Sequence, residues 1–324
     1  MTVSRVLNKV TTVNEEIRDR VLAAVKELDY RPNISARSLV RSRSYLLGLI
    51  YDNPSAAYMS EFLLGSMKQC REAGYHLVVE PCGDNPDKWS SEILSYVKES
   101  RLDGIIMPPP VCDDQTVLEN LRENNVPHVR ISPGKDVSGS PVVFIDDKSA
   151  VKEMTLYLMD SGHKRIGFIS GHPNQNSSRL RYQGFCAAFR ERGLPMDESL
   201  VVQGFYSYRS GLVAAELLLN RPNPPTAIFA GNDDMAVAVY ACAQRHKLQI
   251  PDQLSVAGFD DTTTATMIWP ALTTIRQPIA AMASEAIKLL VRKIDSNTEQ
   301  RDSDQVPLEY ELIKRDSVVP PRRD

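Results

Sequence analysis

After residue 44 the sequence alternates between short apolar runs and longer stretches with the periodicity of amphipathic helices. The strand candidates are YLLGLIY (45–51), YHLVVEP (75–81), GIIMPP (104–109), PHVRIS (127–132), RIGFIS (165–170), TAIFAG (226–231) and LSVAGFD (254–260). The helix candidates between them span residues 57–73, 88–100, 114–124, 147–161, 178–193, 208–219 and 232–246. Such alternation is typical of parallel sheets covered by helices. Because these units are too many for one doubly wound sheet, we predict an α/β fold with two Rossmann-like lobes.

Enzymes that bind dinucleotides share this architecture, but their motifs are absent from the sequence. No G-x-G-x-x-G follows a strand candidate, and no G-x-x-x-x-G-K-[ST] or G-x-S-x-G occurs. The five histidines lack the spacing of metal ligands, and the five cysteines form no C-x-x-C pair. We therefore predict a protein that is not an enzyme and that has no cofactor, no metal site and no disulfide framework.

The sequence contains no candidate for a membrane span. Its longest apolar runs, at 45–51 and 227–230, are far shorter than the roughly 20 residues that a membrane helix needs. The N-terminus also lacks the apolar core of a signal peptide. These features predict a cytoplasmic protein with no membrane partner.

Charge is distributed unevenly along the chain. Residues 1–44 contain nine basic and five acidic side chains, a net charge of +4, whereas the remaining 280 residues carry a net charge of −7. A basic segment attached to an acidic body suggests that the segment contacts a polyanion such as a nucleic acid. Taken alone the signal is weak, because basic solvated helices are common.

The basic segment itself contains two helix candidates. Thr12 or Asn14 can cap a helix that runs to about Leu28, with Glu15 and Glu16 in its first turn. This helix must end before Pro32, because a residue that precedes proline is disfavoured in the α region. A second helix fits residues 33–41 but is too short to be stable alone in water. Composition alone favours a solvated linker there.

Three N-terminal segments and the C-terminus carry a family resemblance. They are TVSRVLN (2–8), EEIRDRVLAAVKELDYRPN (15–33), ARSL (36–39) and LIKRDSVVPP (312–321). In order and spacing they are similar to the lactose- and galactose-repressor (LacI/GalR) family, and the similarity extends over the whole chain. The resemblance implies a homodimeric repressor of carbohydrate-utilisation genes, in which a helix-turn-helix head precedes a body of the periplasmic-binding-protein type I fold.

The resemblance also implies domain limits and an oligomer interface. The head with its hinge helix spans residues 1–44, the N-terminal lobe spans 45–161 plus 277–307, and the C-terminal lobe spans 162–276 plus 308–324. Helices near 56–73 and 279–292 are the candidate elements of a dimer interface.

In the family the stretch TVSRVLN is the recognition helix of the helix-turn-helix, and an earlier helix braces it. That earlier helix does not appear in this sequence. Either translation starts about twenty codons upstream or the chain is a natural truncation, which would bind an effector but not DNA. We expect a misplaced start, because an unbraced helix would expose Val3, Val6 and Leu7 without benefit.

The implied contacts with operator DNA fall into two groups. In the recognition helix they are Thr2, Ser4, Arg5 and Asn8, at base edges or phosphates of the major groove. In the hinge helix they are Asn33, Ala36, Arg37 and Leu39. Leu39 matches the apolar wedge that enters the minor groove, whereas the residues alone allow an ordinary surface leucine equally well.

Ligands of open α/β sheets lie beyond the carboxyl ends of the strands, which here means between the two lobes. The candidate effector-binding residues are Asp52, Tyr58, Asp146, Arg181, Tyr206, Asn232, Asp260 and Gln277. Taken singly, several of them are equally well explained as helix caps or as satisfied polar groups at strand ends. Together they match the effector-binding positions of the family.

The resemblance gives five of the candidates a role. Arg181 would bind effector hydroxyls or a carboxylate, Asn232 and Asp260 would bind vicinal hydroxyls, and the rings of Tyr58 and Tyr206 would stack on a sugar. The roles of Asp146 and Gln277 are open.

Two departures from the family pattern affect the expected ligand. Pro108 stands where sugar-binding relatives often have a polar side chain, and Asp52 adds an acid. An acidic cleft with tyrosines suits a mono- or oligosaccharide or a glycoside better than a phosphate ester. A sugar-binding protein without a regulatory role is the rival interpretation, but it requires a signal peptide and no basic head.

Overall fold

The computed structural model describes residues 6, 14–28, 43–83, 85–134, 140–296 and 304–321. The chain divides into two compact units, Met1–Tyr45 and Leu46–Asp324. This division lies within one residue of the limit predicted for the head. The predicted helix at 33–41 lies outside the described residues, as do all the predicted contacts with DNA, namely Thr2, Ser4, Arg5, Asn8, Asn33, Ala36, Arg37 and Leu39.

The first unit contains helix α2, Glu15–Glu27. The side chain of Asn14 accepts a hydrogen bond of 2.9 Å from the backbone N–H of Glu16, so Asn14 is the N-cap. Glu15 and Glu16 occupy the first turn, where their charge complements the helix dipole. The prediction of a capped helix is therefore confirmed, with Asn14 rather than Thr12 as the cap.

The second unit contains two six-stranded sheets. The strand order in the first sheet is β11-β5-β4-β3-β1-β2, and all its pairs are parallel. These strands are β1 Leu46–Tyr51, β2 His76–Pro81, β3 Gly104–Met107, β4 His128–Ile131, β5 Val142–Ile145 and β11 Gln305–Leu308. Residues of β3 and β4 are buried throughout, as expected for central parallel strands.

The second sheet has the strand order β12-β10-β9-β8-β6-β7, with only the pair β10–β12 antiparallel among its described pairs. The strands are β6 Ile166–Ser170, β7 Val201–Gln203, β8 Ala227–Ala230, β9 Ser255–Asp260, β10 Thr273–Arg276 and β12 Glu311–Ile313. The predicted α/β fold with two Rossmann-like lobes is thus confirmed.

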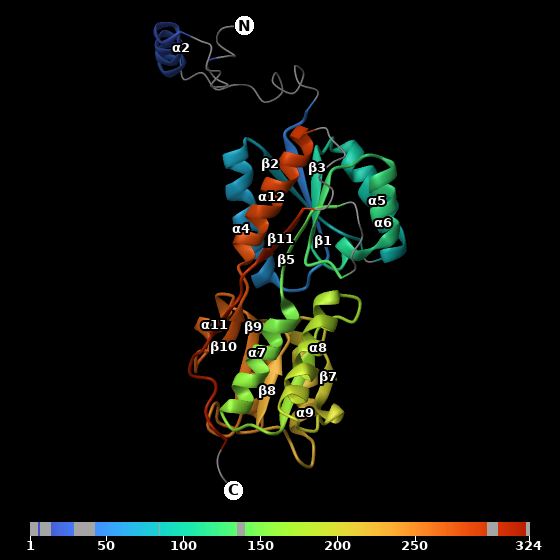
Figure 1. Cartoon of the computed structure of the whole chain (residues 1–324), viewed down its shortest axis with the longest axis vertical. Coiled ribbons are helices and arrows are strands. Elements are labelled where there is room, and N and C mark those ends of the chain that lie inside the picture. Colours follow the sequence, from blue (N-terminus) through green and yellow to red (C-terminus); the bar gives the residue numbers. More distant parts are fainter. Residues whose placement is uncertain are drawn as a thin grey trace. The chain divides into compact units, whose positions relative to one another are not determined.

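Helices pack in pairs on the two sheets (Figure 1). Around the first sheet lie α4 (Ala56–Ala73) with α12 (Ile279–Ser296), and α5 (Pro86–Glu99) with α6 (Gln115–Glu123). Around the second lie α7 (Asp147–Asp160) with α8 (Asn176–Glu191), and α9 (Tyr208–Leu219) with α10 (Asp233–Arg245). The short elements are α11 (Thr264–Met267) and the 3₁₀ turns η1 (Val111–Asp113) and η2 (Glu198–Leu200). No helix in the described part of the chain is long and apolar enough to span a membrane.

The chain passes between the lobes three times: after β5, after β10, and between β11 and β12. The sequence-based limits place two crossings at 277 and 308, next to the ends of β10 at Arg276 and of β11 at Leu308. The crossing predicted at 161 differs, because α7 packs against α8 of the second lobe, which places the crossing near residue 146. At Gly184 a Cβ would lie 2.3 Å from the backbone oxygen of Lys148, so this glycine permits the close approach of the two helices.

Candidate ligand-binding site

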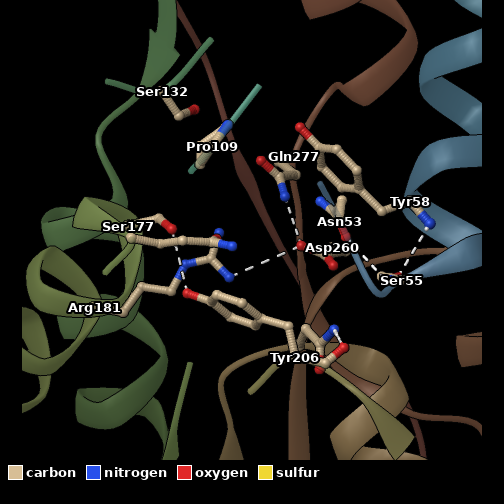
Figure 2. Close-up of a pocket in the computed structure, with 12 residues that line it drawn as sticks. Asn53, Ser55, Tyr58, Pro109, Ser132, Ser177, Arg181, Tyr206, Asp260 and Gln277 are labelled. Atoms are coloured by element: carbon tan, nitrogen blue, oxygen red, sulfur yellow. Dashed lines mark hydrogen bonds and ion pairs between the residues drawn. The ribbon is translucent and has the colours of Figure 1, made fainter. Parts of the chain in front are cut away.

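A pocket of about 420 Å³, open solvent included, lies between the two lobes (Figure 2). Residues that follow strands or begin helices line it, which is where open α/β sheets bind ligands. From the first lobe come Asn53, Ser55, Tyr58, Pro109 and Ser132, and from the second come Gln175, Ser177, Arg181, Tyr206, Asn232 and Asp260. Gln277 lines it from the crossing between β10 and α12.

A turn after β1 places Tyr58 in the pocket. The Asn53 side chain accepts a hydrogen bond from the Ser55 backbone N–H at 2.9 Å. Ser55 is the N-cap of α4 and accepts from the Tyr58 backbone N–H at 3.3 Å. Burial, and to a lesser extent the nearby Asp260 carboxyl, raises the pKa of the Tyr58 hydroxyl well above its usual value. The phenol is therefore neutral at physiological pH and available as a hydrogen-bond donor.

Arg181 lies at the centre of the polar contacts. Its Nε donates to Oδ1 of Asp147 at 2.7 Å, and its Nη1 donates to the Gly231 carbonyl at 2.6 Å. The guanidinium carbon lies 3.5 Å from the centroid of the Phe259 ring, which covers one of its faces. Asp147 is only 2% exposed and Arg181 6%, so this is a buried ion pair.

Tyr206 and Asn232 form a second wall. The Tyr206 backbone has φ of +58°, and its hydroxyl lies 3.3 Å from Oγ of Ser177. Asn232 donates through Nδ2 to the Tyr206 carbonyl at 3.0 Å and accepts at Oδ1 from the Met235 backbone N–H at 3.0 Å. Asn232 therefore caps α10 and lines the pocket at once, so the two interpretations of this residue do not exclude each other.

Asp260 and Gln277 join the second lobe to the crossing segment. Gln277 donates through Nε2 to Oδ1 of Asp260 at 2.5 Å. The same carboxylate oxygen lies 4.0 Å from Nη1 of Arg181. Burial raises the pKa of Asp260 well above its usual value, while Arg181 acts in the opposite direction.

Asp233, the first residue of α10, is hydrogen-bonded to the segments that contain Thr262 and Thr274. It accepts from the Thr262 backbone N–H at 2.8 Å and from the Thr274 hydroxyl at 2.7 Å. Burial raises the pKa of Asp233 to about 7, although these hydrogen bonds oppose the shift.

The structure brings together most of the effector-binding residues predicted from the sequence. They are Tyr58, Arg181, Tyr206, Asn232, Asp260 and Gln277. Asp52 and Asp146 are exposed and are not among the lining residues, and Asp146 caps α7 by accepting from the Ser149 backbone N–H at 3.0 Å. Pro109, rather than Pro108, faces the pocket.

Sequence reasoning missed several polar residues of the site. The lining residues not predicted are Asn53, Ser55, Ser132, Gln175 and Ser177. Asp147, which holds Arg181, was also missed, although its neighbour Asp146 was predicted. Asn53, Ser55 and Ser132 follow strands of the first sheet, so the rule that selected Asp52 applies to them as well. Among the described residues, no group of three or more His, Cys, Asp or Glu side chains is arranged to hold a metal.

Two sequence profiles match the chain. The profile of bacterial regulatory proteins of the lacI family matches residues 1–33, and that of a periplasmic binding protein-like domain matches residues 155–318. Among curated proteins, the HTH-type transcriptional regulator DegA of Bacillus subtilis (strain 168) is 33% identical over 322 residues, which are 98% of this chain and 94% of DegA. The HTH-type transcriptional repressor PurR of Escherichia coli O139:H28 is 34% identical over 322 residues, 98% of this chain and 93% of PurR.

Solved structures agree with these sequence matches. A complex of the transcriptional regulator CelR with cellobiose has a TM-score of 0.78 and 28% identity, covering 97% of this chain and 94% of CelR. The lac repressor dimer bound to operator and the anti-inducer ONPF has a TM-score of 0.79 and 25% identity, covering 98% of this chain and 94% of the repressor. The resemblance found in the sequence is confirmed, and the chain belongs to the LacI family of bacterial transcriptional regulators.

Proposed function

We propose that this regulator is a cytoplasmic homodimeric repressor of carbohydrate-utilisation genes, and that a mono- or oligosaccharide or a glycoside in the inter-lobe pocket controls its binding to operator DNA. The observation that carries the proposal is the composition of the pocket. Two tyrosines, Tyr58 and Tyr206, share it with the side chains of Arg181, Asn232 and Asp260.

This combination suits a polyhydroxyl compound. A sugar has apolar C–H faces that stack on aromatic rings, and hydroxyl pairs that bond to carboxylates, amides and guanidinium groups. Asp260 accepts hydrogen bonds, whereas Arg181 donates them, so each partner of a vicinal diol has a counterpart. The serine hydroxyls of Ser132 and Ser177 can donate or accept.

The relatives support the proposal in three respects. CelR was solved with cellobiose, the lac repressor was solved as a dimer on its operator, and PurR is named a repressor. The matches to these proteins cover nearly the whole chain.

Contacts between the lobes beside the pocket provide a route for control. Asn176 at the start of α8 donates through Nδ2 to the Pro133 carbonyl at 3.3 Å, and Arg179 donates to the Gly134 carbonyl at 3.5 Å. An effector that changes the angle between the lobes must break or remake such contacts. Effector and operator then alter each other's affinity by equal free energies.

The proposed dimer would use exposed apolar side chains of α4. Leu64 is 69% exposed and Met67 is 52% exposed, and α4 packs beside α12, the other predicted interface helix. Exposed large apolar groups in such proximity are typical of a protein interface.

The experiment is a pair of titrations on the full chain. Isothermal titration with a panel of mono- and disaccharides and glycosides is expected to find at least one saturable ligand. Electrophoretic mobility shifts on operator fragments selected from genomic DNA should then change in the presence of that sugar. Tight binding of purines with no response to any sugar would contradict the proposed effector class.

A further inference from the structure

Some of the N–H groups with which Arg181 could bind an anion are already hydrogen-bonded within the protein. A guanidinium binds carboxylate or phosphate best through two parallel N–H bonds from one edge. The edge that contains Nε is already engaged by Asp147, at 2.7 Å. The other edge contains Nη1, which donates to the Gly231 carbonyl at 2.6 Å. Two of the five N–H groups of Arg181 thus have partners among the described residues, and the free ones are both of those on Nη2 and the second on Nη1.

The charge of Arg181 is also compensated. Asp147 is 2% exposed and forms an ion pair with the guanidinium at Nε, and Asp260 lies 4.0 Å from Nη1 of Arg181. The charged residues that line the pocket are Arg181 and Asp260. With Asp147 counted, the three groups sum to zero when Asp260 is protonated and to −1 when it is ionised. In neither state does the pocket present a net positive charge to a ligand.

Asp147 is placed for this role by the crossing between the lobes. It is the first residue of α7, and α7 packs against α8, the helix that carries Arg181. The preceding Asp146 carries the same carboxylate but points to solvent and caps the helix. The two neighbouring acids therefore provide a matched pair, of which only Asp147 touches Arg181.

We propose that Asp147 is a specificity-determining positioning residue, which holds Arg181 by its Nε and cancels its charge so that the pocket accepts neutral polyhydroxyl effectors and rejects anionic ones such as sugar phosphates and sugar acids. The inference rests on the proposed effector pocket and narrows its ligand class. The sequence predicts that Arg181 binds hydroxyls or a carboxylate of the effector. Under this proposal Arg181 binds effector hydroxyls and not an effector carboxylate.

The test uses inorganic phosphate as the probe, so that it does not depend on which sugar is the effector. Wild-type chain, Asp147→Asn and Asp146→Asn are titrated with phosphate in a chloride buffer, and binding is followed by calorimetry. Asparagine has the shape of aspartate and can still accept a hydrogen bond, but it removes the negative charge that is bonded to Arg181, so the net charge of the three groups rises by one. We expect Asp147→Asn to bind phosphate about tenfold more tightly than the wild type, a change of about 1.4 kcal/mol, because close charged pairs are coupled by at least about this much. Asp146→Asn should behave as the wild type does.

A second substitution separates this role from a general structural one. The gain in phosphate binding should disappear in Asp147→Asn/Arg181→Gln, since the released guanidinium is the proposed receptor. Circular dichroism establishes that each variant is folded, and Asp147→Ser replaces Asp147→Asn if the latter is not. A structural role alone would give no gain that depends on Arg181.

The contrary outcomes are equally specific. No gain in Asp147→Asn, an equal gain in Asp146→Asn, or a gain that survives loss of Arg181 would each overturn the inference. A protein that shows the expected phosphate response but binds no sugar would refute the proposed function and leave the role of Asp147 intact. A protein that binds a sugar but whose Asp147→Asn variant gains no affinity for phosphate would support the proposed function and refute the role of Asp147.

Discussion

Nε2 of Gln277 donates to Oδ1 of Asp260 at 2.5 Å, and this bond joins the end of β9 to the segment that carries the chain from β10 into α12. Asp260 ends a strand of the second lobe, whereas α12 covers the first sheet. A pocket residue is thus bonded to one of the crossings about which the lobes would move.

Replacing Gln277 by Met removes the amide donor but keeps the length of the side chain. We expect unfolding by urea to require about 1–3 kcal/mol less free energy, since a buried carboxyl loses a hydrogen bond. Effector affinity should fall as well. Gln175→Met is the control, because Gln175 lines the same pocket and forms no side-chain cap bond. Equal losses in both variants would contradict a specific role for the Gln277–Asp260 bond.

Replacing Arg181 by Met leaves the buried Asp147 without its partner. The expected loss of stability is about 3–5 kcal/mol, the usual cost of breaking a buried ion pair from one side. Arg181→Met/Asp147→Asn should be more stable than Arg181→Met alone, because it removes the orphaned charge. Urea unfolding of both variants measures the difference, and a double variant less stable than the single one would refute this account of the pair.

The sequence predicted the alternation of strands and helices well, because each amphipathic stretch reports a buried face. It did not predict which sheet a helix covers. The periodicity of α7 is the same whether its apolar side packs on the first or the second lobe. The lobe that α7 covers depends only on the path of the chain after β5. Short strands such as β7, Val201–Gln203, were not predicted either, since three residues show no usable period.

A similar limitation explains why the sequence pointed to Asp146 and not to Asp147 as a site residue. Both positions at the start of a helix favour acids, as cap and as first-turn residue, so composition cannot tell which carboxylate faces inward. The residues placed best were those at the ends of buried strands, such as Asp260, the last residue of β9, and Asn232, which follows β8. Their direction is set by the sheet, which the sequence pattern reveals.

The contribution of Asp233 to the stability of the second unit should fall as the pH rises from about 4 to about 7. The pKa of Asp233 is raised to about 7 in the folded chain, whereas the pKa of an unfolded aspartate is about 3.9. The folded state therefore binds more protons in this window, and the free energy of unfolding decreases with pH, by about 4 kcal/mol at most for this group. In thermal melts Asp233→Asn should therefore make the slope of stability against pH more positive than in the wild type. A slope unchanged by Asp233→Asn would contradict the assignment.

Gly171 lets the Tyr206 ring occupy its place in the pocket wall. A Cβ on Gly171 would lie 1.9 Å from Cζ of Tyr206, so Gly171→Ala must displace the ring of this buried side chain. We expect effector affinity to fall about tenfold, since stacking and a hydrogen bond are both disturbed. Stability should fall by about 1–3 kcal/mol, the usual cost of overpacking a buried site, and Gly171→Ala/Tyr206→Ala should bind no more weakly than Tyr206→Ala alone. A further loss in the double variant would show that the alanine acts elsewhere.

Leu64 on α4 tests the proposed dimer without touching the pocket. A glutamate at this position would place a charge in an apolar interface, where an unpaired charge is strongly unfavourable. Leu64→Glu should therefore shift the protein from dimer to monomer in analytical ultracentrifugation and weaken operator binding, because one head then binds without its partner. Effector binding in the pocket should persist, which distinguishes loss of the dimer from loss of the fold. Val79→Glu is the matched control, since Val79 is also exposed, at 37%, but lies on the edge strand β2 rather than on α4. A Leu64→Glu protein that remains dimeric would place the interface on another surface.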